Sequence, residues 1–100
     1  MSELSELDNK VFIGEKPFMN YVSAVVMQFT IHNADEVIIL ARGKFISRAV
    51  DVEEVVKNRF LKDEVELKDI KINSEEFKSK EEENKNVRVS IIEITLQRKK

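Results

Sequence analysis

The hydrophobic period changes along this chain, and the change limits the fold more than any other feature of the sequence. Apolar residues recur every three or four positions in 17–31 and again in 45–60, which predicts two amphipathic helices. The apolar runs 11–13 and 37–41 are too short for helices and predict buried strands. Apolar and charged residues then alternate in 65–96, as they do in strands. The predicted order is β-α-β-α-β-β, a two-layer α+β arrangement of the broad α/β class.

The sequence of the predicted strands leads to three further predictions. Segment 37–41 is apolar throughout, so we expect a central strand that is covered on both faces. The phase of the alternation shifts between 65–67 and 70–72, and again within 87–96, which predicts a bulge or a strong twist in each of two paired strands. The polar segment between them predicts a mobile hairpin arm, at about 73–88, that extends beyond the body.

Length and composition favour one domain without cysteine or metal chemistry. The 100 residues have room for one core, so we expect a flexible acidic leader at 1–10 and a single domain at 11–100. No apolar run approaches the roughly 20 residues that span a bilayer, and the leader lacks the pattern of a signal peptide. A cytoplasmic location is therefore expected. Without cysteine, and with His32 as the only histidine, we expect no disulfide and no zinc cluster.

The net charge argues weakly against binding to nucleic acid. The formal charge is −2, whereas proteins that coat nucleic acid are usually basic. The excess of acidic residues lies in the leader, which contains Glu3, Glu6 and Asp8 but only one basic residue, Lys10. The balanced remainder can still carry a basic face, because the potential depends on where the charges lie.

The two glycines of the chain occupy equivalent places. Gly14 follows one predicted strand and leads through Lys16 into a helix, while Gly43 follows another strand, between Arg42 and Lys44, and leads into the next helix. Glycine permits close approach of the backbone, and a helix N-terminus with basic neighbours attracts phosphate. If the two strands are parallel neighbours, the three basic side chains form one patch. The competing interpretation is that each glycine is there only because the turn from strand to helix has no room for a side chain. The basic side chains would then serve only to keep the surface soluble.

Other kinds of site have little support. Neither a G-x-G-x-x-G nor a G-x-x-x-x-G-K-[ST] stretch is present, so nucleotide cofactors are not expected. His32 falls at a helix end, where capping is the simpler role. Asp51, Glu53 and Glu54 point in different directions on a helix and make a poor pair of catalytic carboxylates. We therefore expect no catalytic residue, no cofactor and no enzyme activity, and we interpret 98–100 as a solubilising tail.

Four segments together resemble the archaeal Alba family of chromatin proteins. Segment 13–22, IGEKPFMNYV, resembles the family's I-G-K-K-P-x-M-N-Y-V, and 41–51, ARGKFISRAVD, is similar to A-R-G-[RK]-x-I-[SN]-[KR]-A-V-D. Segment 56–60, VKNRF, is similar to V-[RK]-N-R-F, and 89–94, VSIIEI, to V-S-T-I-E-I. The resemblance extends over about residues 11–97.

The resemblance implies a fold like the C-terminal domain of translation initiation factor three. It implies a homodimer, or a heterodimer with a second Alba protein, that binds and coats double-stranded DNA without reading its sequence, with no membrane as a partner. The expected role is chromatin architecture and compaction on the chromosome. A subunit that binds RNA, with DNA as the secondary ligand, is the alternative.

The resemblance also implies residue roles. Phe60 matches an aromatic position used between neighbouring dimers, although a place in the core is an equally open interpretation. Glu15 stands where the family has a lysine that is often described as acetylated, which leaves Lys16 as the remaining candidate for acetylation. The expected nucleic-acid-binding residues lie at the two glycine junctions and on the arm: Lys16, Arg42, Lys44, Arg48, Lys78, Lys80, Lys85 and Arg88.

Overall fold

The computed structural model, which describes residues 9–79 and 85–100, confirms the predicted order of helices and strands. The chain is already in the first strand at Lys10, and residues 1–8 of the predicted leader lie outside the described part. The elements are β1 (Lys10–Phe12), α2 (Phe18–Thr30), β2 (Glu36–Arg42), the 3₁₀ turn η1 (Gly43–Phe45), α3 (Ile46–Val55), the π-helical turn η2 (Val56–Phe60), β3 (Val65–Lys78) and β4 (Asn86–Arg98).

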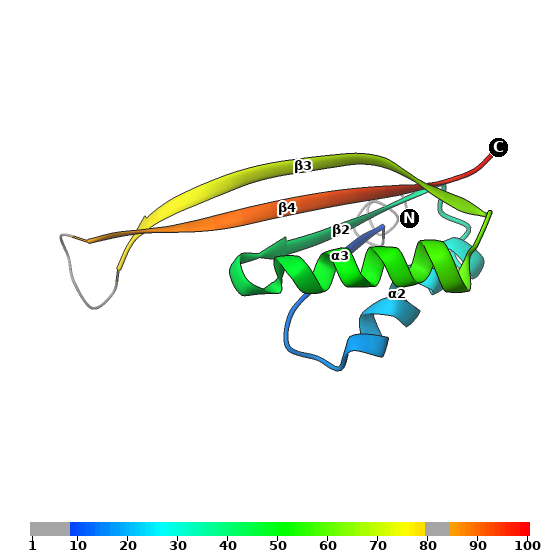
Figure 1. The fold of residues 1–100 in the computed structure, drawn as a ribbon, viewed down its shortest axis with the longest axis horizontal. Helices are drawn as coiled ribbons and strands as arrows, with labels where there is room; N and C mark the ends of the chain where they lie inside the picture. The colour runs from blue at the N-terminus through cyan, green and yellow to red at the C-terminus, as the bar shows by residue number, and fades with distance from the viewer. Residues whose placement is uncertain (1–8, 80–84) are drawn as a thin grey trace.

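One four-stranded sheet, in the order β1-β2-β4-β3, carries both helices on a single face (Figure 1). The strand β1 runs parallel to β2, and the other two pairings are antiparallel. Alternate strand residues pack against the helices. The largest fully buried side chains are Val22, Val25, Phe29, Val37, Ile39, Val52, Val56, Ile94 and Leu96.

The expectation that β2 is covered on both faces is wrong. Val37 and Ile39 on the helix side are fully buried, whereas Ile38 and Leu40 on the other side are only partly buried. Phe12 of β1, which pairs with Leu40, is 69% exposed on that same open face. Both helices pack on the same side of the sheet, so no helix or strand of residues 9–79 and 85–100 covers the second face (Figure 1).

The strands β3 and β4 form the predicted hairpin arm. They pair from Val65 and Arg98 to Lys78 and Asn86, and the distal part extends well beyond the helices (Figure 1). A register shift at Lys68 is the bulge predicted for β3.

Of the bulge or strong twist predicted for β4, the bulge is absent, because consecutive residues of β4 pair with β3 over 86–98 and with β2 over 91–97, and the one register shift lies on β3. The apolar phase of β4 shifts because Ile91 and Ile92 are consecutive and lie on opposite faces of the sheet. Ile92 is buried on the helix side, and Ile91 is partly buried on the open face.

The C-terminal end of α2 is held by a residue from the end of the chain. Arg98 donates hydrogen bonds through Nη2 to the carbonyl oxygens of Phe29, at 2.7 Å, and Ala34, at 3.0 Å. The carbonyl group of Phe29 belongs to the last turn of the helix, where carbonyl oxygens lack intrahelical N–H partners, and that of Ala34 follows the helix. Asn33, the predicted stop, adopts a left-handed φ of 57° just after the helix. The interpretation of Arg98 as part of a solubilising tail is therefore wrong.

The helical segment after β2 ends in a π turn, which changes the direction of Phe60. The N–H of Leu61 donates to the carbonyl oxygen of Val56, five residues earlier, at 2.8 Å. A regular α-helix would place Phe60 above Val56 on the core side. The wider turn brings Leu61 there instead, where it is only 4% exposed, and leaves Phe60 48% exposed. The interpretation of Phe60 as a core residue is therefore wrong.

Candidate nucleic-acid interface

The two glycine junctions lie at the same end of the sheet, as predicted for parallel neighbours. Phe12 of β1 is in register with Leu40 of β2, so Gly14 and Gly43 follow corresponding ends of adjacent strands. Lys16 and Lys44 are exposed beside them. The end of the sheet that carries both junctions is also the end from which the arm extends (Figure 1).

Each glycine is required for a different reason. Gly43 adopts a φ of +56°, which residues with a side chain rarely adopt. At Gly14 a Cβ atom would lie 3.3 Å from the hydroxyl oxygen of Tyr21, closer than an ordinary contact. The backbone of the first junction therefore approaches Tyr21 in a way that a side chain would obstruct.

Tyr21 and Arg48 fix the conformation of the first junction. The backbone N–H of Lys16 donates to Tyr21 Oη at 2.9 Å. Arg48 Nη1 donates to the carbonyl oxygens of Gly14 and Lys16, at 2.6 and 2.8 Å, and its guanidinium carbon lies 5.8 Å from the centre of the Tyr21 ring. Arg48 belongs to α3, so this contact ties the first junction to the second. The sequence carried no signal for this role of Arg48, because its partners lie 34 and 32 positions away.

The lysines of the two junctions are free to meet a ligand. Lys16 and Lys44 form no ion pair with any residue in 9–79 or 85–100. Lys44 Nζ lies 5.4 Å from the ring centre of Phe45, a contact that leaves its three N–H donors available. The ammonium groups can therefore bind phosphate oxygens without first losing a carboxylate partner.

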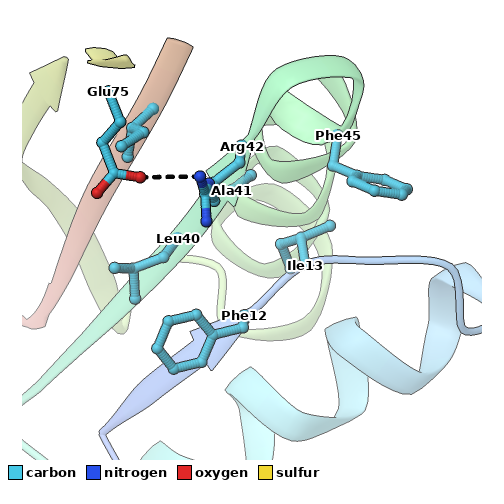
Figure 2. Close-up of a pocket in the computed structure, with 8 residues that line it drawn as sticks. Phe12, Ile13, Leu40, Ala41, Arg42, Phe45 and Glu75 are labelled. Atoms are coloured by element: carbon cyan, nitrogen blue, oxygen red, sulfur yellow. Dashed lines mark ion pairs between the residues drawn. The ribbon is translucent and has the colours of Figure 1, made fainter. Parts of the chain in front are cut away.

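The arginines predicted for the same role are already paired. Arg42 Nη2 lies 2.8 Å from Glu75 Oε1 of β3, and Figure 2 shows this ion pair beside the end of β2. On the arm, Arg88 Nη2 lies 2.9 Å from Glu76 Oε2, directly across the β3-β4 pairing. Arg42, Arg88 and Arg48 thus have intramolecular partners, unlike the junction lysines.

The arm lysines form a separate group near the end of the hairpin. Lys78 is the last residue of β3 and is exposed, and Lys85 precedes β4. The hairpin is held there by the N–H of Ser79, which donates to the carbonyl oxygen of Lys85 at 2.8 Å. Lys80 lies outside the described residues. The arm lysines are distant from the glycine junctions along the molecule (Figure 1), so the predicted cations form two groups.

A mainly apolar hollow of about 460 Å³ adjoins Arg42 on the open face of the sheet. Figure 2 shows Phe12 and Leu40 on one side of it and the ion pair of Arg42 with Glu75 on the other. The remaining lining residues come from β2, from β4 and from the segments that follow β1 and β2: Ala41, Ile91, Ile13 and Phe45. The apolar surface of the hollow and the guanidinium group of Arg42 therefore lie side by side at this end of the sheet.

The acidic residues of α3 are arranged differently from the expectation. Glu53 and Glu54 both contact Lys57, at 3.4 and 2.9 Å, whereas Asp51 is exposed. Among residues 9–79 and 85–100, no group of three His, Asp or Glu side chains could hold a metal ion. No helix in this described part is long and apolar enough to cross a bilayer.

Known proteins match this chain over most of its length. The family model for Alba matches residues 9–74. The DNA/RNA-binding protein Alba of Methanococcus maripaludis is 51% identical over 90% of this chain and 98% of its own length, and DNA/RNA-binding protein Alba 1 of Archaeoglobus fulgidus is 54% identical over 92% and 98%. The solved structure of Alba from Thermoplasma volcanium superposes with a TM-score of 0.78 at 44% identity, covering 89% of this chain and 99% of that one. The chain belongs to the Alba family.

Proposed function

We propose that the protein binds double-stranded DNA through its phosphates, coats it without reading its sequence, and so contributes to the architecture and compaction of chromatin. The relatives described above are named DNA/RNA-binding proteins. The observation that carries the proposal is the pair of glycine junctions at one end of the sheet, each with an exposed and unpaired lysine. Glycine lets the DNA backbone approach, and lysine supplies a compact positive charge for a phosphate. Contacts of this kind position a protein but carry no sequence information.

The proposed DNA-binding unit is a homodimer. Phe12 is the most exposed aromatic side chain among the described residues, and it lines hollows on both of its sides, against the open sheet face and against α2. A second copy of the chain that covers Phe12 would remove this apolar surface from water. A dimer also presents the junction lysines twice, which doubles the charge available to one duplex.

The size of the particle in solution tests the dimer. We expect Phe12→Ser to lower the mass measured by sedimentation from two chains towards one. Phe77→Ser is the matched control, because Phe77 is also exposed but lies on the arm. A parent protein that sediments as one chain would exclude the homodimer. Assembly that occurs only with a second Alba protein would establish the heterodimer instead.

RNA is the second candidate ligand. The names of the relatives include both nucleic acids, and phosphate is common to both. Two acidic residues of the arm, Glu75 and Glu76, take up arginines that would otherwise be free to contact a DNA groove. A junction-centred contact to phosphate does not discriminate between the two nucleic acids as a groove contact would.

Titrations with several nucleic acids test the proposed function. Shuffled duplexes of equal length and base composition should bind with affinities within about threefold of one another. This range corresponds to a difference of roughly 0.65 kcal/mol in the free energy of binding. If Lys16, Arg42 and Lys44 of both chains each neutralise one phosphate, log affinity should fall against log salt with a slope of about −5. Competition by structured RNA at fixed salt ranks the two ligands. A tenfold preference for one DNA sequence would contradict the proposal.

A further inference from the structure

The ion pair between Arg42 and Glu75 is set by the sheet. Arg42 of β2 is in register with Ile91 of β4, and Ile91 is in register with Asn73 of β3. Glu75 lies two residues beyond Asn73, so it is on the same face as Arg42. The two long side chains meet above the middle strand, with an N–O distance of 2.8 Å, beside the apolar side chain of Ile91. The pairing therefore depends on strand order and register, both of which the fold fixes.

The ion pair between Arg42 and Glu75 uses the same donor groups that an arginine would use to bind a phosphate. A guanidinium group binds carboxylate and phosphate oxygens with the same planar set of N–H donors. Glu75 presents one carboxylate oxygen to Arg42 Nη2, a donor that a phosphodiester oxygen would otherwise take. The side chains of Arg42 and Glu75 are 58% and 55% exposed, so a phosphate can reach the pair and replace the carboxylate without unfolding the arm.

We infer that Glu75 sets the affinity of the glycine-junction site by occupying Arg42 as an internal competitor of the nucleic-acid phosphate. This inference rests on the proposed function. In the free protein Arg42 is neutralised by Glu75, whereas Lys16 and Lys44 have no such partner among residues 9–79 and 85–100. Binding through the lysines therefore needs no exchange, and engagement of Arg42 requires the carboxylate to leave.

The expected size of the effect follows from the exposure of the pair. Ion pairs on the protein surface contribute little, and their loss changes an equilibrium by up to about fivefold. Glu75→Gln should therefore tighten binding of duplex DNA by about threefold to fivefold for each Arg42 that contacts the duplex. Glutamine has nearly the same shape as glutamate, so the arm and its register should be preserved.

A double-mutant cycle separates this effect from a general loss of negative charge. Four full-length proteins would be titrated with one random-sequence duplex at fixed salt: the parent, Glu75→Gln, Arg42→Gln and the double variant. Glu93→Gln is the matched control, because Glu93 lies on the open face of the same sheet and forms no ion pair with a described residue. Thermal melts would verify that every variant is folded.

The inference requires two results together. Glu75→Gln must bind at least about threefold more tightly than Glu93→Gln, and the gain must vanish when Arg42 is already glutamine. Equal gains in Glu75→Gln and Glu93→Gln, or a gain that persists without Arg42, would overturn the inference and leave the proposed function standing. If the folded parent and all variants fail to bind DNA or RNA at low salt, the proposed function fails and the inference fails with it.

Discussion

Glu53 is the one charged side chain that the described part of the chain buries. Its side chain is 5% exposed, Lys57 Nζ lies 3.4 Å from Oε2, and this oxygen has no hydrogen-bond partner among the described residues. Burial, followed by a hydrogen bond with Glu54, raises the pKa of Glu53 from 4.5 to about 7. Hydrogen bonds from Glu53 and Lys57 lower the pKa of Glu54 to about 2. Between these two pKa values the pair holds one proton.

This pair predicts that the protein loses stability as the pH rises through the weakly acidic range. Above the unfolded pKa of 4.5 the unfolded chain releases a proton that folded Glu53 keeps until about pH 7. The free energy of unfolding should therefore fall by roughly 2 to 3 kcal/mol across this window. Glu53→Gln should remove most of the fall, because an amide does not ionise. Urea unfolding at several pH values measures it, with Asp51→Asn on the exposed face as control. A parent protein with constant stability over this window would contradict the prediction.

Arg48 is expected to act by positioning the first glycine junction and not by contacting phosphate. Arg48→Gln removes donors to the carbonyl oxygens of Gly14 and Lys16, so the free energy of unfolding should fall by about 2 kcal/mol. DNA binding should weaken while the slope of log affinity against log salt stays unchanged. A direct phosphate contact would instead reduce the slope by about 0.9 for each chain. Arg59→Gln, the same change at an exposed arginine, controls for stability.

Single residues could be predicted from the sequence only where their surroundings are local. Lys16 and Lys44 were predicted because each follows a glycine by one or two positions, and a turn fixes such neighbours. The partners of Arg42 and Arg48 could not be predicted, since they are joined to them only by strand pairing and helix packing. Whether any of these residues binds nucleic acid stays a prediction.

The C-terminal end of α2 depends on a residue from the other end of the domain. Arg98→Met keeps the aliphatic stem but removes the donors to the carbonyl oxygens of Phe29 and Ala34. We expect a loss of about 2 kcal/mol in the free energy of unfolding, because these acceptors lose charge-assisted hydrogen bonds. Faster amide hydrogen exchange at the end of α2 should accompany it. Lys100→Met, a similar change at the exposed chain end, should have almost no effect. Equal losses in the two variants would show that Arg98 acts only through its charge.

Periodicity predicted the helices and strands but not the irregular turns within them. A stripe at three-to-four spacing defines which side of a helix is buried, and this was confirmed for Val22, Val25 and Phe29. The same spacing misplaced Phe60, because the hydrogen bond from Leu61 to Val56 closes a π turn. No residue type marks this turn in the sequence. It follows from how the end of the helix packs before β3 begins.

The arrangement of the whole chain was predictable from rules of connection. A strand, a helix and a second strand of these lengths return in parallel, and two long strands joined by a polar segment form a hairpin. Both were confirmed. The open face of the sheet was not predicted, because a continuous apolar strand looks the same in sequence whether the described chain covers one of its faces or both.

We predict that Phe60 forms the contact between neighbouring dimers when many of them bind one duplex. It is 48% exposed on the π turn, away from the glycine junctions, so it can contact a neighbouring dimer while the junctions hold DNA. Phe60→Ala should change the free energy of unfolding by less than about 1 kcal/mol, whereas a core phenylalanine would cost about 3–5 kcal/mol. Binding of one dimer to a short duplex should be unaffected. Coating of a long duplex should lose cooperativity, because only there do neighbouring dimers meet.

Two titrations and a melt test this prediction. Electrophoresis with a short and a long duplex separates intrinsic affinity from cooperativity, and calorimetry gives the stability. Phe77→Ala is the matched control, since Phe77 is 47% exposed but lies on the arm. If the arm contacts DNA, this control weakens binding to both duplexes equally and leaves cooperativity intact. Cooperative coating by Phe60→Ala as strong as that of the parent would exclude Phe60 from the contact between dimers, and the exposed ring would then be open to a different partner.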